Sequence, residues 1–244
     1  MTGPWFVASP EWWTDGEVTL PEDESHHATR VLRVTPPDVI TVTDGNGTVA
    51  RCSVRSIDGK SVTTEVVERT RHRRLRPEVV VYQAAAKSSK IDMVIERLAE
   101  LGVSETHSFE SARSVARWDE RKLRRLDERW SAIARAAAKQ SRNPFMMLTK
   151  AGLGFHDLLA LIGREPLAVC LWEEASFPLR TALLEPAERV ALVVGPEGGF
   201  ERTEAEAIAD AGAQLVSLGP RILRTENAAF AATSALLFHY GLIG

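Results

Sequence analysis

The sequence has few cysteines and no long apolar segment. Only two of its 244 residues are cysteine, Cys52 and Cys170, and they lie far apart in strand-like apolar stretches. This spacing suggests neither a disulfide framework nor a metal knuckle, so we expect two buried, reduced thiols. No run reaches the roughly 18 apolar residues that span a bilayer, and the first residues lack a basic segment followed by an apolar one. We therefore expect a cytoplasmic protein with no membrane partner.

Several common active-site patterns are also absent. No segment has the spacing of a Walker phosphate loop, and no Gly-x-Gly-x-x-Gly follows a first strand, as dinucleotide binding would require. His26 and His27 are adjacent, so their rings cannot share one metal ion as histidines four residues apart can, and we expect no metal. No serine lies in an esterase-like elbow. These absences argue against phosphate-loop, dinucleotide, metal and esterase sites.

Charges of both signs are present but unevenly distributed. The net charge of −3 argues weakly against a nucleic-acid partner. Residues 113–142, however, hold ten basic side chains against four acidic ones, and residues 69–76 hold five arginines. Residues 173–210 have the opposite balance, with nine acids against three arginines. This asymmetry suits a protein that presents one face to phosphates, although a solvated helix face and a polar linker would give the same pattern.

The N-terminal part of the chain, residues 1–70, has the pattern of a small β domain. Its β-branched stretches alternate with turn residues, first at 44–47 and then at 58–60, which favours hairpins. Residues 25–33 have the pattern of one short helix. We therefore expect a small β barrel with one helix, followed by a basic linker at 71–76. The predicted strands cover residues 17–20, 39–43, 49–57 and 61–68.

Strands and helices alternate in residues 77–244, which predicts an α/β domain with a mainly parallel sheet. The strand segments are nearly all apolar, as expected when helices cover both faces of the sheet. Capping patterns predict helix starts at Ser89 and Thr203, and Thr225 is expected to cap the last helix. The predicted strands cover residues 79–84, 104–109, 167–172, 190–195 and 214–218. The predicted helices cover residues 89–101, 118–140, 203–211 and 225–240.

Glycine-containing segments follow two of the predicted strands. Ligands of open α/β sheets bind at the carboxyl ends of the strands, so these segments are the candidate site. Residues 195–200 are Gly-Pro-Glu-Gly-Gly-Phe, and residues 218–227 begin with Leu-Gly-Pro and enter a helix. Glycines at such positions let the backbone approach a ligand closely. The repeated Gly-Pro suggests one shared site, but the pattern alone is compatible with several ligands.

Both segments resemble a known cofactor-binding signature. GPEGGF and LGPRILRTENAAFAATSAL are similar to the cofactor loops of the SPOUT class of methyltransferases. Within that class the chain most resembles the ribosomal RNA small-subunit methyltransferase E family, which methylates N3 of a uridine in 16S rRNA. The resemblance covers most of the chain, in the order of the family, and includes HHATRVLRV, DGNG, KSSKIDMVIERLAELGV and RWSAIARAAAKQSRNP.

The resemblance implies a fold, a cofactor and partners. It implies an N-terminal PUA-like RNA-binding barrel, a C-terminal α/β domain with a deep trefoil knot, and a homodimer that acts on 16S rRNA or the small ribosomal subunit. The cofactor would be S-adenosylmethionine, held in the knot by backbone groups of the two Gly-Pro loops and of the loop near Leu171 and Trp172. The cofactor-binding residues that it implies are Leu171, Val194, Gly195, Pro196, Gly198, Gly199, Leu218, Gly219, Ile222, Leu223, Thr225, Asn227 and Ala228.

The implied reaction needs a fixed positive charge. Methylation at N3 removes a weakly acidic imide proton, and negative charge spreads onto the neighbouring carbonyl oxygens. Arg224 at the mouth of the second loop is the first candidate to stabilise that charge, unless it only starts the helix. We expect Glu197, Glu226 and Asn227 to orient the base or the cofactor. Arg142 is expected to contact RNA phosphate or the active site of the partner subunit. The arginines expected to bind RNA are Arg30, Arg33, Arg73, Arg113 and Arg124.

Two positions depart from the family pattern. The family usually has a basic residue before paired aromatic residues near its start, whereas Gly3 and Pro4 precede Trp5 here, so that RNA contact is not expected. Ser88 stands after Lys87 where the family usually has glycine, which asks for a slightly different turn. The alternative functions are a methyltransferase of the same class acting on another RNA or on a ribose 2′-hydroxyl, and a non-catalytic assembly factor that binds rRNA.

Overall fold

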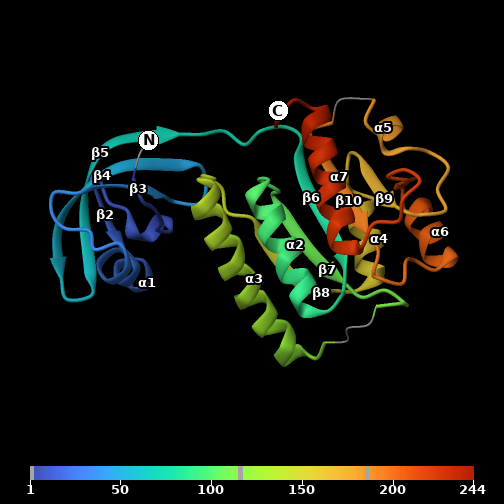
Figure 1. The fold of residues 1–244 in the computed structure, drawn as a ribbon, viewed down its shortest axis with the longest axis horizontal. Coiled ribbons are helices and arrows are strands. Elements are labelled where there is room, and N and C mark those ends of the chain that lie inside the picture. The colour runs from blue at the N-terminus through green and yellow to red at the C-terminus, as the bar shows by residue number, and fades with distance from the viewer. Residues whose placement is uncertain (1–2, 115–117, 185–186) are drawn as a thin grey trace. The chain divides into compact units, whose positions relative to one another are not determined.

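The structure, a computed structural model, describes residues 3–114, 118–184 and 187–244. The chain forms two compact units (Figure 1). The first unit is Met1–Arg74 with Ala138–Met146, and the second is Leu75–Ala137 with Met147–Gly244. The second segment of the first unit was not among the expected domain limits, because the helical pattern of the sequence runs through residue 138 without a break.

Five strands of the first unit form one sheet, in the order β1, β3, β4, β5, β2. β1 pairs with β3 in parallel, and the other neighbours are antiparallel. All four predicted strands are present, and β1 is an additional strand whose three residues are too few to show a periodicity. The strands are β1 (Trp5–Val7), β2 (Glu17–Leu20), β3 (Val39–Thr43), β4 (Thr48–Asp58) and β5 (Ser61–Arg71).

The helical segment of the first unit begins earlier than predicted. It comprises α1 (Glu22–His26) and a π-helical turn, η2 (His27–Val31), and a short 3-10 helix, η1 (Pro10–Trp12), precedes β2. The predicted hairpin after β3 is confirmed. There the carboxylate of Asp44 accepts hydrogen bonds from the backbone nitrogens of Asn46 (2.7 Å) and Thr48 (2.8 Å), which closes the turn.

The segment Ala138–Met146 is bonded to the strands and helix of its unit. Lys139 Nζ lies 2.7 Å from the carboxylate of Glu24, which is buried. The backbone nitrogen of Gly47 donates a hydrogen bond of 3.0 Å to the carbonyl of Pro144. Arg142, a predicted site residue, lies in this segment and has a left-handed backbone with a φ of 58°.

Six parallel strands form the sheet of the second unit, in the order β11, β9, β10, β6, β7, β8. The prediction of a mainly parallel sheet is therefore confirmed. All five predicted strands are present, and β8 at the edge is an additional one. The strands are β6 (Glu78–Ala84), β7 (Glu105–Phe109), β8 (Leu148–Leu153), β9 (Ala168–Leu171), β10 (Arg189–Val194) and β11 (Gln214–Val216).

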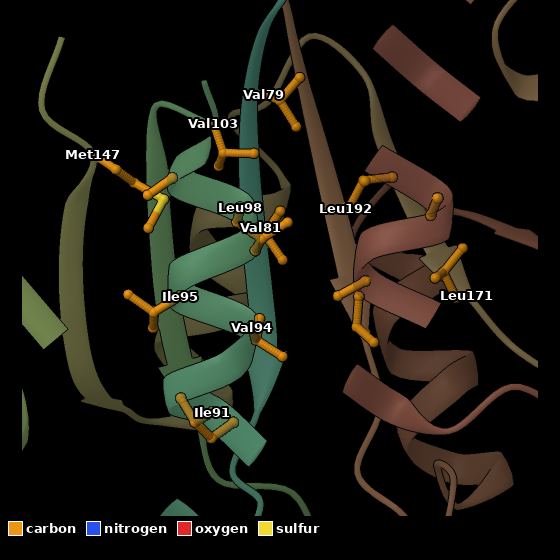
Figure 2. Close-up of a cluster of buried hydrophobic side chains, with 14 of the residues drawn as sticks. Val79, Val81, Ile91, Val94, Ile95, Leu98, Val103, Met147, Leu171 and Leu192 are labelled. Carbon is orange, nitrogen blue, oxygen red and sulfur yellow. The ribbon is translucent and has the colours of Figure 1, made fainter. Parts of the chain in front are cut away.

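Helices cover both faces of this sheet. On one face, Val79 and Val81 of β6 pack with Ile95 and Leu98 of α2 in a cluster that also includes residues of α3 and α7 (Figure 2). On the other face, Val80, Tyr82 and Ala84 of β6 pack in a cluster with residues of α4 and α6. Apolar runs in the strands follow from this two-sided burial. The helices are α2 (Ser88–Glu100), α3 (Glu120–Ser141), α4 (Phe155–Ile162), α5 (Leu179–Ala182), α6 (Arg202–Asp210) and α7 (Thr225–His239).

The predicted helix caps are wrong by one or two residues. At the start of α6, the backbone nitrogen of Glu201 donates to the carboxylate of Glu204 at 3.0 Å, so the capping box lies two residues before the predicted one. Thr225 is inside α7 rather than at its cap, because its hydroxyl donates a hydrogen bond to the carbonyl of Gly195 instead. The observed N-caps are Lys87 for α2, Glu201 for α6 and Arg224 for α7.

Both cysteines are buried and free, as predicted. Burial raises the pKa of the Cys52 and Cys170 thiols, so both stay protonated at neutral pH. Among the helices that the structure describes, none is long and apolar enough to cross a membrane. Within the same residues, no group of three or more His, Cys, Asp or Glu side chains is arranged to hold a metal ion.

Candidate active site

A cleft of about 740 Å³ lies at the carboxyl ends of β9, β10 and β11, which are neighbours in the sheet of the second unit. Three segments form its walls, and they follow these three strands at residues 172–173, 195–200 and 217–224. The two Gly-Pro loops therefore face one cleft. The predicted site residues that line it are Leu171, Val194, Gly195, Pro196, Glu197, Gly198, Gly199, Leu218, Gly219, Ile222, Leu223, Arg224, Thr225 and Ala228.

The first loop, residues 195–200, is a tight turn anchored by an aromatic side chain. The backbone nitrogen of Gly199 donates a 3.0 Å hydrogen bond to the carbonyl of Pro196, and Gly199 has a φ of 69°. A Cβ at Gly199 would collide with the carboxylate of Glu173. Phe200 is buried and stacks on Phe109, with 6.2 Å between ring centroids and 9° between planes. The positive φ favours glycine in this turn, and any other residue would also displace the carboxylate of Glu173.

The second loop, residues 217–224, presents backbone to open space. Gly219 has a φ of 114°, and a Cβ built there meets no atom within 4 Å. The hydroxyl of Ser217 accepts a hydrogen bond of 3.1 Å from the backbone nitrogen of Gly219, which fixes the turn. Ile222 is 88% exposed although it is apolar. This loop therefore leaves both its backbone and an apolar side chain available to a ligand in the cleft.

A buried hydrogen-bond chain ties the start of α7 to the first loop. The fully buried amide of Gln83, in β6, donates a 2.8 Å hydrogen bond to the hydroxyl of Thr225. That hydroxyl in turn donates a 2.5 Å hydrogen bond to the carbonyl of Gly195. These bonds connect β6, the first loop and the start of α7, the helix that follows the second loop.

Acidic and basic side chains meet at the cleft wall. Lys90 Nζ lies 3.3 Å from Glu197 Oε1 and 3.5 Å from Glu226 Oε2. Arg224 lines the cleft with an exposed side chain, and as N-cap of α7 it makes no side-chain capping bond. A guanidinium has no acceptor atom, so the Arg224 side chain cannot cap the backbone N–H groups of α7. The side chain of Asn227 lies elsewhere, where its oxygen accepts a 3.4 Å hydrogen bond from Arg97.

The predicted RNA-binding arginines lie in both units. Arg30, Arg33 and Arg73 are exposed in the first unit. In the second unit Arg124 is exposed on α3, with Glu120 one helical turn away at 3.8 Å. Arg113 is also exposed, but its guanidinium donates a 3.2 Å hydrogen bond to the carbonyl of Gly198. That contact supports the first cleft loop from outside.

Comparisons with known proteins identify the family. The RNA methyltransferase domain family matches residues 73–237, and the RNA methyltransferase PUA domain family matches residues 20–67. The chain is 35% identical over 218 residues to ribosomal RNA small subunit methyltransferase E of Mycobacterium bovis, covering 88% of this chain and 83% of that protein. It is 31% identical to the protein of the same name from Bacillus subtilis, covering 91% and 90%. The chain belongs to the ribosomal RNA small subunit methyltransferase E family.

Solved structures support the same assignment. A small subunit methyltransferase E from Neisseria gonorrhoeae, solved bound to S-adenosylmethionine, has a TM-score of 0.86 at 25% identity, and 98% of each chain is covered. A methyltransferase from Legionella pneumophila, in complex with the same cofactor, has a TM-score of 0.88 at 25% identity, again with 98% of each chain covered. The methyltransferase E fold therefore extends over nearly the whole chain.

Three polar residues of this methyltransferase E cleft were missed from the sequence. Lys90 and Glu173 line the cleft, and Gln83 holds Thr225 beneath it. Gln83 lies near the carboxyl end of β6, the neighbour of β10 in the sheet, and Lys90 lies in α2, the helix that follows β6. The rule that ligands bind at carboxyl ends of strands could have indicated them, but only once the pairing of β6 with β10 was known.

Proposed function

We propose that this chain transfers a methyl group from S-adenosylmethionine to N3 of a uridine in 16S rRNA of the small ribosomal subunit. The observation that carries the proposal is the cleft between two Gly-Pro loops at the carboxyl ends of β9, β10 and β11. Family membership supports the rRNA substrate, and the two solved relatives support the cofactor. The choice of uridine N3 rests on the resemblance to the family.

The cleft residues fit the cofactor. The volume of the cleft, about 740 Å³, lies within the range of roughly 300–1,000 Å³ that is typical of ligand pockets. Leu171, Val194 and Ala228 give it apolar walls for an adenine ring, and the open side of Gly219 gives backbone groups for polar atoms. When bound, S-adenosylmethionine supplies an electrophilic methyl group on a positively charged sulfur.

The side chains of the cleft then act on the uridine. Loss of the N3 proton to solvent water would leave negative charge on N3 and on the two neighbouring carbonyl oxygens of the base, and N3 would lose this charge on bonding the methyl group. Arg224 stabilises that charge with its guanidinium, and the N-terminus of α7 adds a partial positive charge at the same place. Glu197 on the opposite loop orients the base or the cofactor, and Arg142 contacts phosphate or the partner subunit's site.

We expect Gly199→Ala to weaken cofactor binding by about tenfold, because alanine is strained at a φ of 69° in a loop that lines the cleft, and its Cβ displaces the carboxylate of Glu173. Isothermal titration with S-adenosylmethionine measures the effect. Gly212→Ala is the matched control, since Gly212 also has a positive φ but has free space around it and does not line the cleft. Equal affinity of both variants would contradict a role of the Gly199 turn in binding.

RNA binding is proposed to involve the exposed arginines of both units. For single-stranded RNA, the slope of log affinity against log salt is about −0.7 per phosphate neutralised. Replacing Arg73 and Arg124 by Gln should therefore flatten the slope by roughly 1.4, measured by fluorescence anisotropy with an rRNA fragment. Arg164→Gln, an exposed arginine outside the basic stretches, should leave it unchanged. An unchanged slope in the double variant would show that these two side chains are solvated and contact no RNA phosphate.

We also propose the homodimer and the trefoil knot of the SPOUT class. Apolar side chains that are exposed in the second unit support a second copy as partner, because such surfaces mark protein interactions. They include Phe177 at 69%, Leu184 at 74% and Phe238 at 70% exposure. Light scattering should give a molar mass twice the 26.9 kDa of one chain.

We also propose a cytoplasmic location and three segments with the limits 1–70, 71–76 and 77–244.

The function is tested in a strain that lacks this gene. Mass spectrometry of digested 16S rRNA should show loss of one 3-methyluridine, which returns when the wild-type gene is restored. Loss of a methyl group from a ribose, or from another RNA, would instead assign a different substrate. Restoration of the cellular phenotype by Arg224→Ala without restoration of the methyl group would support a non-catalytic assembly factor.

A further inference from the structure

Lys90 connects the first cleft loop with the start of α7. It lies in the first turn of α2, and its ammonium is 3.3 Å from Glu197 of the first loop and 3.5 Å from Glu226 in the first turn of α7. Lys90 and Glu197 both line the cleft. One ammonium group therefore connects the segment after β10 with the helix that follows the second loop.

Glu226 is the more buried of the two carboxylates that Lys90 contacts. Its side chain is only 9% exposed, and within the described residues its Oε2 atom accepts no hydrogen bond. A buried carboxylate is costly unless a nearby positive charge or hydrogen bonds compensate it. Lys90 supplies that positive charge, so its loss would leave only the partial positive charge of the α7 N-terminus to compensate a buried carboxylate beside the cofactor cleft.

The two carboxylates that contact Lys90 differ in their exposure to the cleft. Glu197 is 23% exposed and reaches the cleft surface, whereas Glu226 lies beneath it. One ammonium thus faces two carboxylates in this group, while Arg221 and Arg224 also line the cleft. Lys90 therefore holds Glu197 in place and leaves its carboxylate accessible from the cleft.

We propose that Lys90 is a positioning residue of the methyl-transfer site. Its ammonium compensates Glu226 at the start of α7 and holds Glu197 on the cleft wall, so that both loops keep the separation at which they bind S-adenosylmethionine. This inference rests on the proposed function. It assigns Lys90 a role that acts through the two glutamates rather than through contact with the reacting atoms.

The test compares variants of the full-length protein by isothermal titration with S-adenosylmethionine. Lys90→Met should weaken binding by about tenfold or more, because a buried charge loses its partner. Lys90→Arg should restore most of the affinity, since a guanidinium can bridge two carboxylates. Adding Glu226→Gln to Lys90→Met should also recover much of the affinity, because no uncompensated charge remains. A general packing role of Lys90 would not produce this second recovery.

Two results would overturn the inference: wild-type affinity in Lys90→Met, or a double variant that binds no better than Lys90→Met. Should Lys90→Met fail to fold, recovery of folding and binding in the double variant supports the inference, and failure of that variant to recover overturns it. Lys60→Met is the matched control and should bind normally, because the Lys60–Glu22 pair is exposed at the surface of the first unit. Failure of the wild-type protein to bind S-adenosylmethionine would instead contradict the proposed function itself.

Discussion

Replacement of Arg224 by alanine should lower kcat by about 100- to 1,000-fold while leaving the affinity for S-adenosylmethionine within about threefold of wild type. The guanidinium stabilises charge that develops on the uridine only during methyl transfer, so its loss affects the transition state more than the bound cofactor. Because the side chain of Arg224 is exposed, the substitution should not change the melting temperature. Single-turnover kinetics with methyl-labelled cofactor measures the rate.

Two further variants make this prediction specific. Arg224→Lys keeps a positive charge but not the planar guanidinium, so it should recover part of the rate. Arg164→Ala removes an exposed arginine far along the chain from both loops and should behave as wild type. A kcat of Arg224→Ala within about threefold of wild type would show that Arg224 only starts the helix.

Arg189→Met should lower the free energy of unfolding of the second unit by about 3–5 kcal/mol. Arg189 begins β10, and its guanidinium lies 3.0 Å from Glu105, 2.9 Å from Glu165 and 3.9 Å from Glu78. These side chains are all less than one third exposed. Without the arginine, three mostly buried carboxylates repel one another. Urea unfolding followed by circular dichroism measures the loss.

The same cluster should make stability depend on acid pH. A hydrogen bond with His107 and then the hydrogen bond and charge of Arg189 lower the pKa of Glu105 from 4.5 to about 2, against burial, which raises it. The ionised carboxylate is thus favoured in the folded state. Its contribution of about 3 kcal/mol is present above pH 4.5 and is lost as the pH falls toward 2. Arg189→Met should show a smaller loss over this range.

Arg202→Met is the matched control for Arg189→Met. Arg202 pairs with Glu174 in the same unit, but the two side chains are 68% and 55% exposed. Exposed pairs contribute at most about 1 kcal/mol, so this variant should unfold close to wild type. Equal destabilisation by both substitutions would show that the buried cluster contributes no more than a surface ion pair.

The parallel sheet was predictable because its central strands are buried on both faces. The continuous apolar runs of β6, β9 and β10 mark such strands in the sequence. β8 was missed because it lies at the sheet edge, where Leu148 and Lys150 are exposed and Gly152 interrupts the pattern. α4 was missed as well, since eight residues give too little periodicity for a helix to be recognised.

The site was predictable where local sequence determines it. The Gly-Pro loops follow strands directly, so Gly199 and Gly219 could be assigned to a cleft before the fold was known. Thr225 was expected to cap α7, but a bond to Gly195, thirty residues away in the chain, holds its hydroxyl instead. Lys90 was missed for the same reason, because its partners Glu197 and Glu226 come from elements that only the folded sheet brings together.

The most direct test of the proposed function is methyl transfer by the purified protein. The protein would be incubated with deuterium-labelled S-adenosylmethionine and small ribosomal subunits from the deletion strain, and the rRNA digested for mass spectrometry. The proposed function predicts one labelled methyl group per subunit, located in 3-methyluridine, and none with Arg224→Ala at the same reaction time. Label in a ribose or in another base, or no label in the rRNA at all, would contradict it.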